Sequence, residues 1–116
     1  IPSGYIDFYP LYSEIVKYTR VAVYDKPGYG WSETTEAARD IDHITEEIHS
    51  LLEQSGEKHL FVAHSIASLE AIRFAQRYGD EVRGIMLIDG ANPGMYASME
   101  LLPSETFAYQ RVRLSI

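Results

Sequence analysis

The strongest constraint on the fold is a regular alternation of helical patterns with short apolar runs. Three segments have apolar residues at helical spacing, and a continuous apolar run follows each of them. The helical segments are residues 7–18, 40–52 and 66–78, and the apolar runs are residues 21–24, 59–63 and 84–89. Strands separated by helices pair in parallel, and parallel strands are apolar on both faces. The chain is therefore predicted to have an α/β fold, a parallel sheet with flanking helices.

The pattern changes after Pro93. Residues 1–94 are predicted to form the α/β core, whereas residues 95–116 carry aromatic and aliphatic residues in helical periods, interrupted by Pro103. This last segment is predicted to form one or two helices that leave the sheet.

Composition excludes several classes of function. The net charge of −7 leaves no basic patch for nucleic acid, and the absence of cysteine excludes disulfides and thiolate metal sites. No window approaches the 18 or more apolar residues of a membrane span, and residues 1–10 lack the features of a signal peptide. A soluble, cytoplasmic protein is expected, with no nucleic acid and no membrane as a partner.

A serine stands where the second apolar run meets the third helix. Ser65 is flanked two residues away by Ala63 and Ala67. A strand that turns directly into a helix holds its central side chain exposed and strained at the carboxyl edge of the sheet, and only small neighbours fit there. The amide of Ile66 then points at the same space as the Ser65 hydroxyl, so the turn offers a nucleophile and an oxyanion donor. A plain helix N-cap is the alternative role for Ser65.

Three segments, in order, resemble the α/β-hydrolase family. Residues 63–67, AHSIA, stand where the family has G-x-S-x-G, with alanine in place of both glycines. Residues 24–32, YDKPGYGWS, resemble the family's D-x-P-G-x-G-x-S turn, and residues 87–93, LIDGANP, resemble the segment after the strand that follows the elbow helix. The resemblance covers residues 8–95. It implies a partial α/β-hydrolase fold whose helical cap begins at 95–116.

The resemblance implies roles for particular residues. Ser65 becomes the nucleophile and the Ile66 backbone amide an oxyanion donor, whereas His64 is expected to pack under the turn rather than act as the base. Four residues of the earlier turn are expected to be structural, since glycine permits the turn and aspartate satisfies local amides. They are Asp25, Gly28, Gly30 and Ser32.

The triad is incomplete in this chain. The family's order is serine, then acid, then histidine, and no histidine follows Ser65. Asp89 is a candidate acid, because it occupies a position from which a minority of the family supply the acid, but a structural role at the strand end is favoured for it. The resemblance also implies a further strand that lies in the sheet between the strands at 21–24 and 59–63. In the chain, this strand and the loop with the second oxyanion amide would precede Ile1. The chain is therefore expected to be a fragment, inactive alone, of a longer protein.

The leading hypothesis is a carboxylesterase-like serine hydrolase. It would cleave an ester or similar acyl bond of a small molecule through Ser65, with no cofactor and no metal. The alternative is an α/β-hydrolase fold that has lost catalysis and serves in ligand binding or protein interaction. A flavodoxin-like domain is a third possibility, disfavoured because no glycine-rich phosphate loop follows the first strand. Exposed strand edges would favour self-association.

Overall fold

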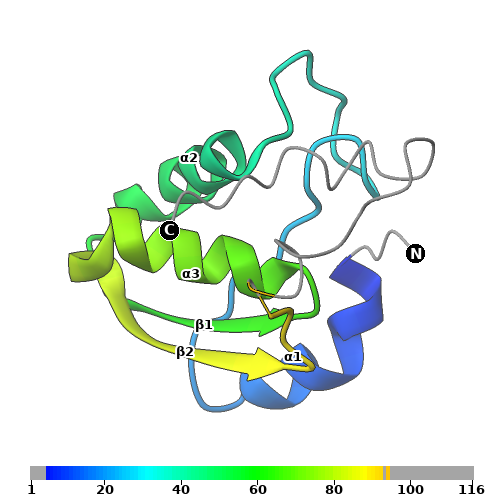
Figure 1. Ribbon diagram of the computed structural model, residues 1–116. Coiled ribbons are helices and arrows are strands. Elements are labelled where there is room, and N and C mark those ends of the chain that lie inside the picture. The colour runs from blue at the N-terminus through cyan, green and yellow to red at the C-terminus, as the bar shows by residue number, and fades with distance from the viewer. Residues whose placement is uncertain (1–4, 93, 95–116) are drawn as a thin grey trace. The chain divides into compact units, whose positions relative to one another are not determined.

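The computed structural model describes residues 5–92 and 94 of the 116-residue chain (Figure 1). The chain falls into two compact units, Ile1–Ala37 and Ala38–Ile116. The predicted cap, residues 95–116, and its junction with the core lie outside the described residues.

The first unit begins with a single short helical stretch. A 3₁₀ turn, η1 (Tyr5–Phe8), leads into the α-helix α1 (Tyr9–Ile15), which carries Pro10 in its first turn. Proline suits this position because its missing amide hydrogen has no partner within the helix. The helix predicted at 7–18 is therefore confirmed, although the α-helix ends three residues earlier.

The strand predicted at residues 21–24 is wrong for this structure. These residues adopt no regular structure, and the described residues contain a two-stranded sheet built from other segments. An apolar run becomes a strand only when the backbone of a neighbouring segment accepts and donates its ladder hydrogen bonds. No described segment pairs in this way with residues 21–24.

The second unit contains the α/β core. Its elements are α2 (Ile41–Leu52), the 3₁₀ turn η2 (Glu53–Ser55), β1 (His59–His64), α3 (Ala67–Arg77), the 3₁₀ turn η3 (Gly79–Glu81) and β2 (Val82–Ile88). Asp40 begins α2 by accepting a hydrogen bond of 2.9 Å from the His43 amide. Gly56, at a φ of 64°, ends the following 3₁₀ turn in the left-handed conformation that favours glycine. The predicted helices and strands of this unit are confirmed.

Strands β1 and β2 pair in parallel. Leu60 lies opposite Gly84 and His64 opposite Ile88, so residues that face each other across the pair share one side of the sheet. The carboxyl ends of both strands therefore meet at one edge. The predicted parallel α/β arrangement is confirmed, with α3 as the crossover helix.

The core lies between α3 and one face of this sheet (Figure 1). Phe74 is fully buried, and its ring lies 4.8 Å from the Phe61 ring of β1. Leu69 and Ala71 of the same helix are also buried. Burial of a phenylalanine or leucine side chain contributes about 1.5–3 kcal/mol. This packing holds α3 against the face of the sheet.

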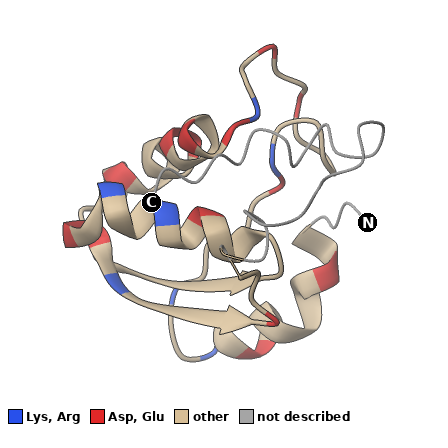
Figure 2. Cartoon of the chain, viewed as in Figure 1, with Lys and Arg blue, Asp and Glu red and all other residues tan. Residues whose placement is uncertain are grey.

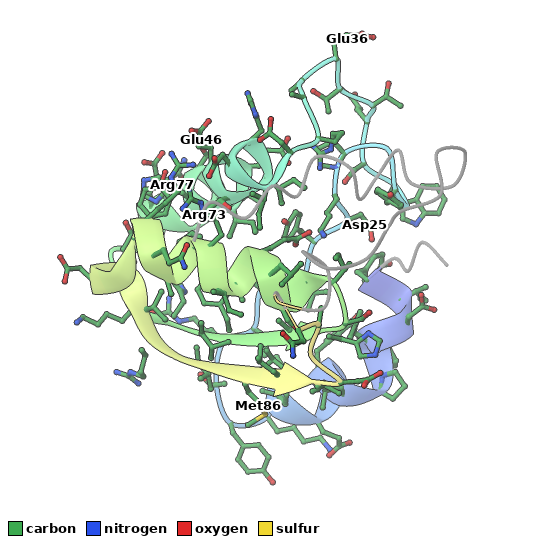
Figure 3. All side chains as sticks on the ribbon, viewed as in Figure 1. Asp25, Glu36, Glu46, Arg73, Arg77 and Met86 are labelled. Carbon is green, nitrogen blue, oxygen red and sulfur yellow. The ribbon has the colours of Figure 1, made fainter. Side chains whose placement is uncertain are left out.

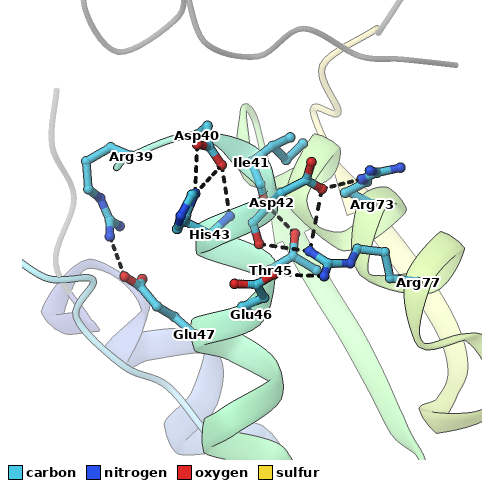
Figure 4. Close-up of polar contacts among 10 residues, drawn as sticks. All are labelled: Arg39, Asp40, Ile41, Asp42, His43, Thr45, Glu46, Glu47, Arg73 and Arg77. Carbon is cyan, nitrogen blue, oxygen red and sulfur yellow. Dashed lines mark hydrogen bonds and ion pairs between the residues drawn. The ribbon is translucent and has the colours of Figure 1, made fainter. Parts of the chain in front are cut away.

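Charged contacts join α2 to α3. Acidic side chains gather on α2, opposite two arginines of α3 (Figures 2 and 4). Arg73 Nε lies 2.7 Å from Asp42 Oδ1, and this hydrogen bond lowers the pKa of the Asp42 carboxyl. Arg77 lies 2.9 Å from Glu46, whose carboxylate raises the pKa of the guanidinium. These pairs are partly exposed, so each contributes less than about 1 kcal/mol and serves mainly to set how the helices are aligned.

The other face of the sheet is apolar and exposed. Leu60 and Val62 of β1 alternate with the residues that face α3, and Met86 and Ile88 lie opposite in β2. Figure 3 shows Met86 projecting away from α3. The sequence analysis predicted strands that are apolar on both faces. One apolar face packs against α3, and these exposed side chains form the other.

Candidate active site

The turn between β1 and α3 has the strained geometry expected of a nucleophile elbow. Ser65 is the single residue between the last residue of β1 and Ile66, which precedes α3, and its φ is 53°. A left-handed conformation costs a residue with a Cβ about 1–2 kcal/mol. Such conformations persist where the surrounding structure imposes them, and they concentrate at functional sites.

Three backbone hydrogen bonds impose the conformation of Ser65. Its amide donates to the Ile88 carbonyl at 3.1 Å, and its carbonyl accepts from the amides of Ser68 at 3.0 Å and Ala91 at 3.3 Å. The bonds come from the first turn of α3 and from the segment that ends and follows β2. The backbone of Ser65 is therefore fixed both by α3 and by the end of β2 with the loop that follows it.

The Ser65 side chain is not a helix cap. Ile66 occupies the N-cap position of α3, and no side chain donates to or accepts from the first amides of that helix. Among the described residues, the half-buried Ser65 hydroxyl has no hydrogen-bond partner. The geometry thus favours an available hydroxyl over the N-cap alternative.

The Ile66 amide is also available. Within the described part of the chain it donates to no acceptor, because it precedes the helix and lies beyond the ladder of β1. An unbonded amide at a helix N-terminus, aided by the helix dipole, stabilises negative charge. The turn therefore presents an unbonded hydroxyl beside an unbonded amide.

Small residues stand at both flanks of the elbow, as predicted. Ala63 is buried at the end of β1, and Ala67 is the partly buried first residue of α3. Larger side chains at these two positions would crowd the turn between strand and helix. Alanine in place of the family's glycines is compatible with the left-handed serine between them.

Asp89 lies at the same edge of the sheet. It follows the last residue of β2, is exposed, and has a φ of 48°. A structural aspartate at a strand end bonds to nearby amides, but within residues 5–92 the Asp89 carboxylate accepts no hydrogen bond. The structure therefore brings Ser65, Ile66 and Asp89 to one edge, where the Ser65 hydroxyl, the Ile66 amide and the Asp89 carboxylate make no hydrogen bond within residues 5–92.

His64 lies on β1, one residue before the elbow. Strand alternation places it on the same side as Leu60 and Val62, opposite Ile88 and on the exposed apolar face. It was expected to pack under the turn; its side chain is instead exposed.

The turn at residues 25–32 is organised by one aspartate, as predicted. In the first unit, Asp25 accepts hydrogen bonds from the Tyr5 amide at 2.6 Å and from the Trp31 amide at 3.2 Å. Its carbonyl accepts from the Ser32 hydroxyl at 2.5 Å. Gly30 has a φ of 52°, and a Cβ there would overlap the Asp25 carboxylate. These residues, with Gly28 at a φ of 84°, build the loop.

A hollow in the described residues lies away from the elbow. A cavity of about 340 Å³ is lined by Leu52, Glu53, Gly56, Glu57, Lys58, Asp80 and Glu81. These residues precede β1 and β2, so the cavity is at the opposite end of the strands from Ser65. Residues 5–92 contain no cluster of three or more side chains suited to holding a metal ion, and no helix among them could cross a membrane.

Two residues beside the elbow were given no role in the sequence analysis. Ser68 is fully buried one turn into α3, and Gly90 follows Asp89. Their proximity depends on the packing of the helix against the loop after β2. The only sequence signal was a serine three residues after the nucleophile candidate.

Comparison with known proteins identifies the family of this chain. The model of the family described as "alpha/beta hydrolase fold" matches residues 7–112, nearly the whole chain. The chain belongs to the α/β-hydrolase fold family.

Two curated relatives are similar to this chain. "Uncharacterized protein YbdG" of Bacillus subtilis (strain 168) is 38% identical over 93 residues, which cover 78% of this chain and 29% of that protein. "Uncharacterized protein C23C11.06c" of Schizosaccharomyces pombe (strain 972 / ATCC 24843) is 32% identical over 76 residues, covering 64% of this chain and 14% of that protein. The chain thus spans less than a third of the length of either relative.

Proposed function

We propose that the protein is a serine hydrolase that cleaves an ester or similar acyl bond with Ser65 as the nucleophile. One observation carries this proposal: a strained, left-handed serine at the carboxyl end of a parallel strand presents an unbonded hydroxyl beside the unbonded Ile66 amide. Strain of about 1–3 kcal/mol at one residue is retained where it serves a site.

The chemistry follows from this arrangement. Ser65 Oγ attacks the acyl carbon while its proton passes to a base, and the C–O π electrons move onto the carbonyl oxygen. The Ile66 amide donates to that oxyanion, and the N-terminus of α3 adds its positive potential. Collapse of the intermediate breaks the bond to the leaving group, which takes the proton from the base. Water then hydrolyses the acyl-enzyme by the same steps.

The base is assigned to a part of the protein outside the described residues. A histidine is the usual base, and the sequence contains none after His64. Asp89 is the candidate acid in this chain, because its carboxylate is at the same sheet edge as Ser65 and accepts no hydrogen bond within residues 5–92. The substrate class is a small molecule with an acyl bond.

The test is covalent labelling of the full-length protein with a fluorophosphonate. Phosphonylation forms the bond from Ser65 Oγ to phosphorus and expels fluoride, so Ser65→Ala is expected to abolish labelling. Ser50→Ala is the matched control, because it removes an exposed serine hydroxyl that bonds to Glu46 in α2. Unchanged labelling of Ser65→Ala would sink the assignment of Ser65.

Labelling also separates the two classes of function. Alanine replaces both elbow glycines, which is compatible with a fold that has lost catalysis and retained ligand binding. A wild-type protein that is folded, is not labelled and does not hydrolyse p-nitrophenyl esters would favour that alternative. Hydrolysis that is lost in both Ser65→Ala and Ser65→Gly would support the enzyme.

A further inference from the structure

A buried hydroxyl without a partner lies beside the elbow. Ser68 is fully buried, and among the described residues its Oγ makes no hydrogen bond. A buried polar group without a hydrogen-bond partner lowers the stability of the folded protein. Unsatisfied groups of this kind are few in native proteins, and each calls for an explanation.

The elbow itself explains why the hydroxyl lacks a partner. A serine or threonine within a helix usually donates to the carbonyl four residues earlier. In α2, Thr45 donates to the Ile41 carbonyl at 2.5 Å and Ser50 to the Glu46 carbonyl at 3.0 Å. The residue four before Ser68 is His64, which belongs to β1, on the strand side of the turn. The left-handed Ser65 thus removes the acceptor that a continuous helix would supply.

The space that Ser68 occupies is next to the loop after β2. A Cβ built on Gly90 would lie 3.2 Å from Ser68 Oγ and 3.1 Å from the Leu87 Cβ. The same loop carries Asp89 at a φ of 48° and bonds to Ser65 through the Ala91 amide. Ser68 Oγ therefore adjoins the segment that holds both the nucleophile candidate and the acid candidate.

We propose that Ser68 is a positioning residue whose hydroxyl donates to the backbone of residues 89–91 during acyl transfer. In the resting structure the donor is held unused, at a cost in stability. As charge develops at the elbow, the hydroxyl donates to the loop that it already adjoins, and the new bond fixes Asp89 and the Ala91–Ser65 contact. An interaction made only in the transition state raises the rate of the chemical step and leaves ground-state binding unchanged. This inference rests on the proposed role of Ser65.

The experiment measures fluorophosphonate labelling and stability in the same full-length variants. Ser68→Ala is expected to lower the maximal labelling rate about tenfold, with the half-saturating probe concentration unchanged. Its melting temperature is expected to stay the same or to rise, since the substitution removes an unsatisfied buried hydroxyl. A residue important only for packing would instead lose stability.

Ser68→Cys tests the hydroxyl against its volume. The thiol fills the same space but is a weak donor, so this variant is expected to label nearly as slowly as Ser68→Ala. It also serves if the alanine variant does not fold. Ser50→Ala is the control, because it removes a serine hydroxyl from another helix, α2, rather than from the elbow or α3.

Three outcomes would overturn the proposal. Wild-type labelling rates in both Ser68 variants would show that the hydroxyl has no part in the reaction. A wild-type rate in Ser68→Cys alone would show that only volume matters. A wild-type protein that is not labelled would reject both this inference and the proposed role of Ser65, whereas the first two outcomes reject the inference alone.

Discussion

Replacing Ser65 by glycine is expected to stabilise the protein relative to replacing it by alanine. Both variants lack the hydroxyl, so the comparison isolates the Cβ at a φ of 53°. That Cβ costs about 1–2 kcal/mol in a left-handed conformation. Glycine lowers the free energy of unfolding by about 0.4–1 kcal/mol relative to alanine, because it makes the unfolded chain more flexible. The difference leaves Ser65→Gly more stable than Ser65→Ala by about 1 kcal/mol.

The same pair of substitutions at Ser50 is the control. Ser50 lies within α2, where glycine is less stable than alanine by about 1 kcal/mol. The sign of the difference is therefore expected to reverse between the two positions, with a total span of about 2 kcal/mol. Urea unfolding with linear extrapolation resolves such a span, provided the slope is the same for all four variants. Glycine below alanine at both positions would refute the left-handed, strained Ser65.

Two further predictions concern the loop at residues 25–32 and the start of α2. Gly30→Ala is expected to lower the free energy of unfolding by about 3 kcal/mol, since left-handed strain adds to displacement of the Asp25 carboxylate from its amides. Gly56→Ala, with nothing within 4 Å of its Cβ, is expected to cost only about 1 kcal/mol; equal losses in urea unfolding would contradict the steric argument. At the start of α2, hydrogen bonds from the His43 amide and ring lower the pKa of Asp40, and Asp40 raises the pKa of His43. The stabilisation from this pair is fully present between the ordinary values of 3.8 and 6.5. It is lost as pH rises through the raised His43 pKa or falls through the lowered Asp40 pKa. Asp40→Asn keeps the helix cap and is expected to flatten this pH dependence in urea unfolding, whereas an unchanged pH profile would exclude the pair as its source.

Helices and paired strands were predictable where local signals sufficed. The helix α2 was readable from its apolar spacing, from Asp40 as its cap and from Gly56 beyond its end. Strands β1 and β2 were readable as apolar runs separated by a helix, which also determines that they pair in parallel. Residues 21–24 have the same apolar character and are not a strand, because pairing depends on a second backbone that the run itself does not encode.

The candidate site was predictable in part. The position of Ser65 between strand and helix followed from small residues at its flanks and from the order of the motifs. Its freedom from capping bonds did not follow, since the same sequence is compatible with an N-cap. Ser68 and Gly90 were missed because the burial of Ser68 and its closeness to Gly90 arise only when α3 packs against the loop after β2.

The sequence by itself determined that Ser65 stands at a strand-to-helix turn of a parallel α/β unit, because apolar periodicity and small flanking residues are local properties of the chain. Only the tertiary structure decided how that serine is held. Hydrogen bonds from the ends of β2 and α3 impose its left-handed backbone, and the same turn separates Ser68 from the carbonyl that a continuous helix would offer. The bonds of Ser65 with Ile88 and Ala91 join segments more than twenty residues apart in the chain, and so they exist only once β1, α3 and β2 are packed together.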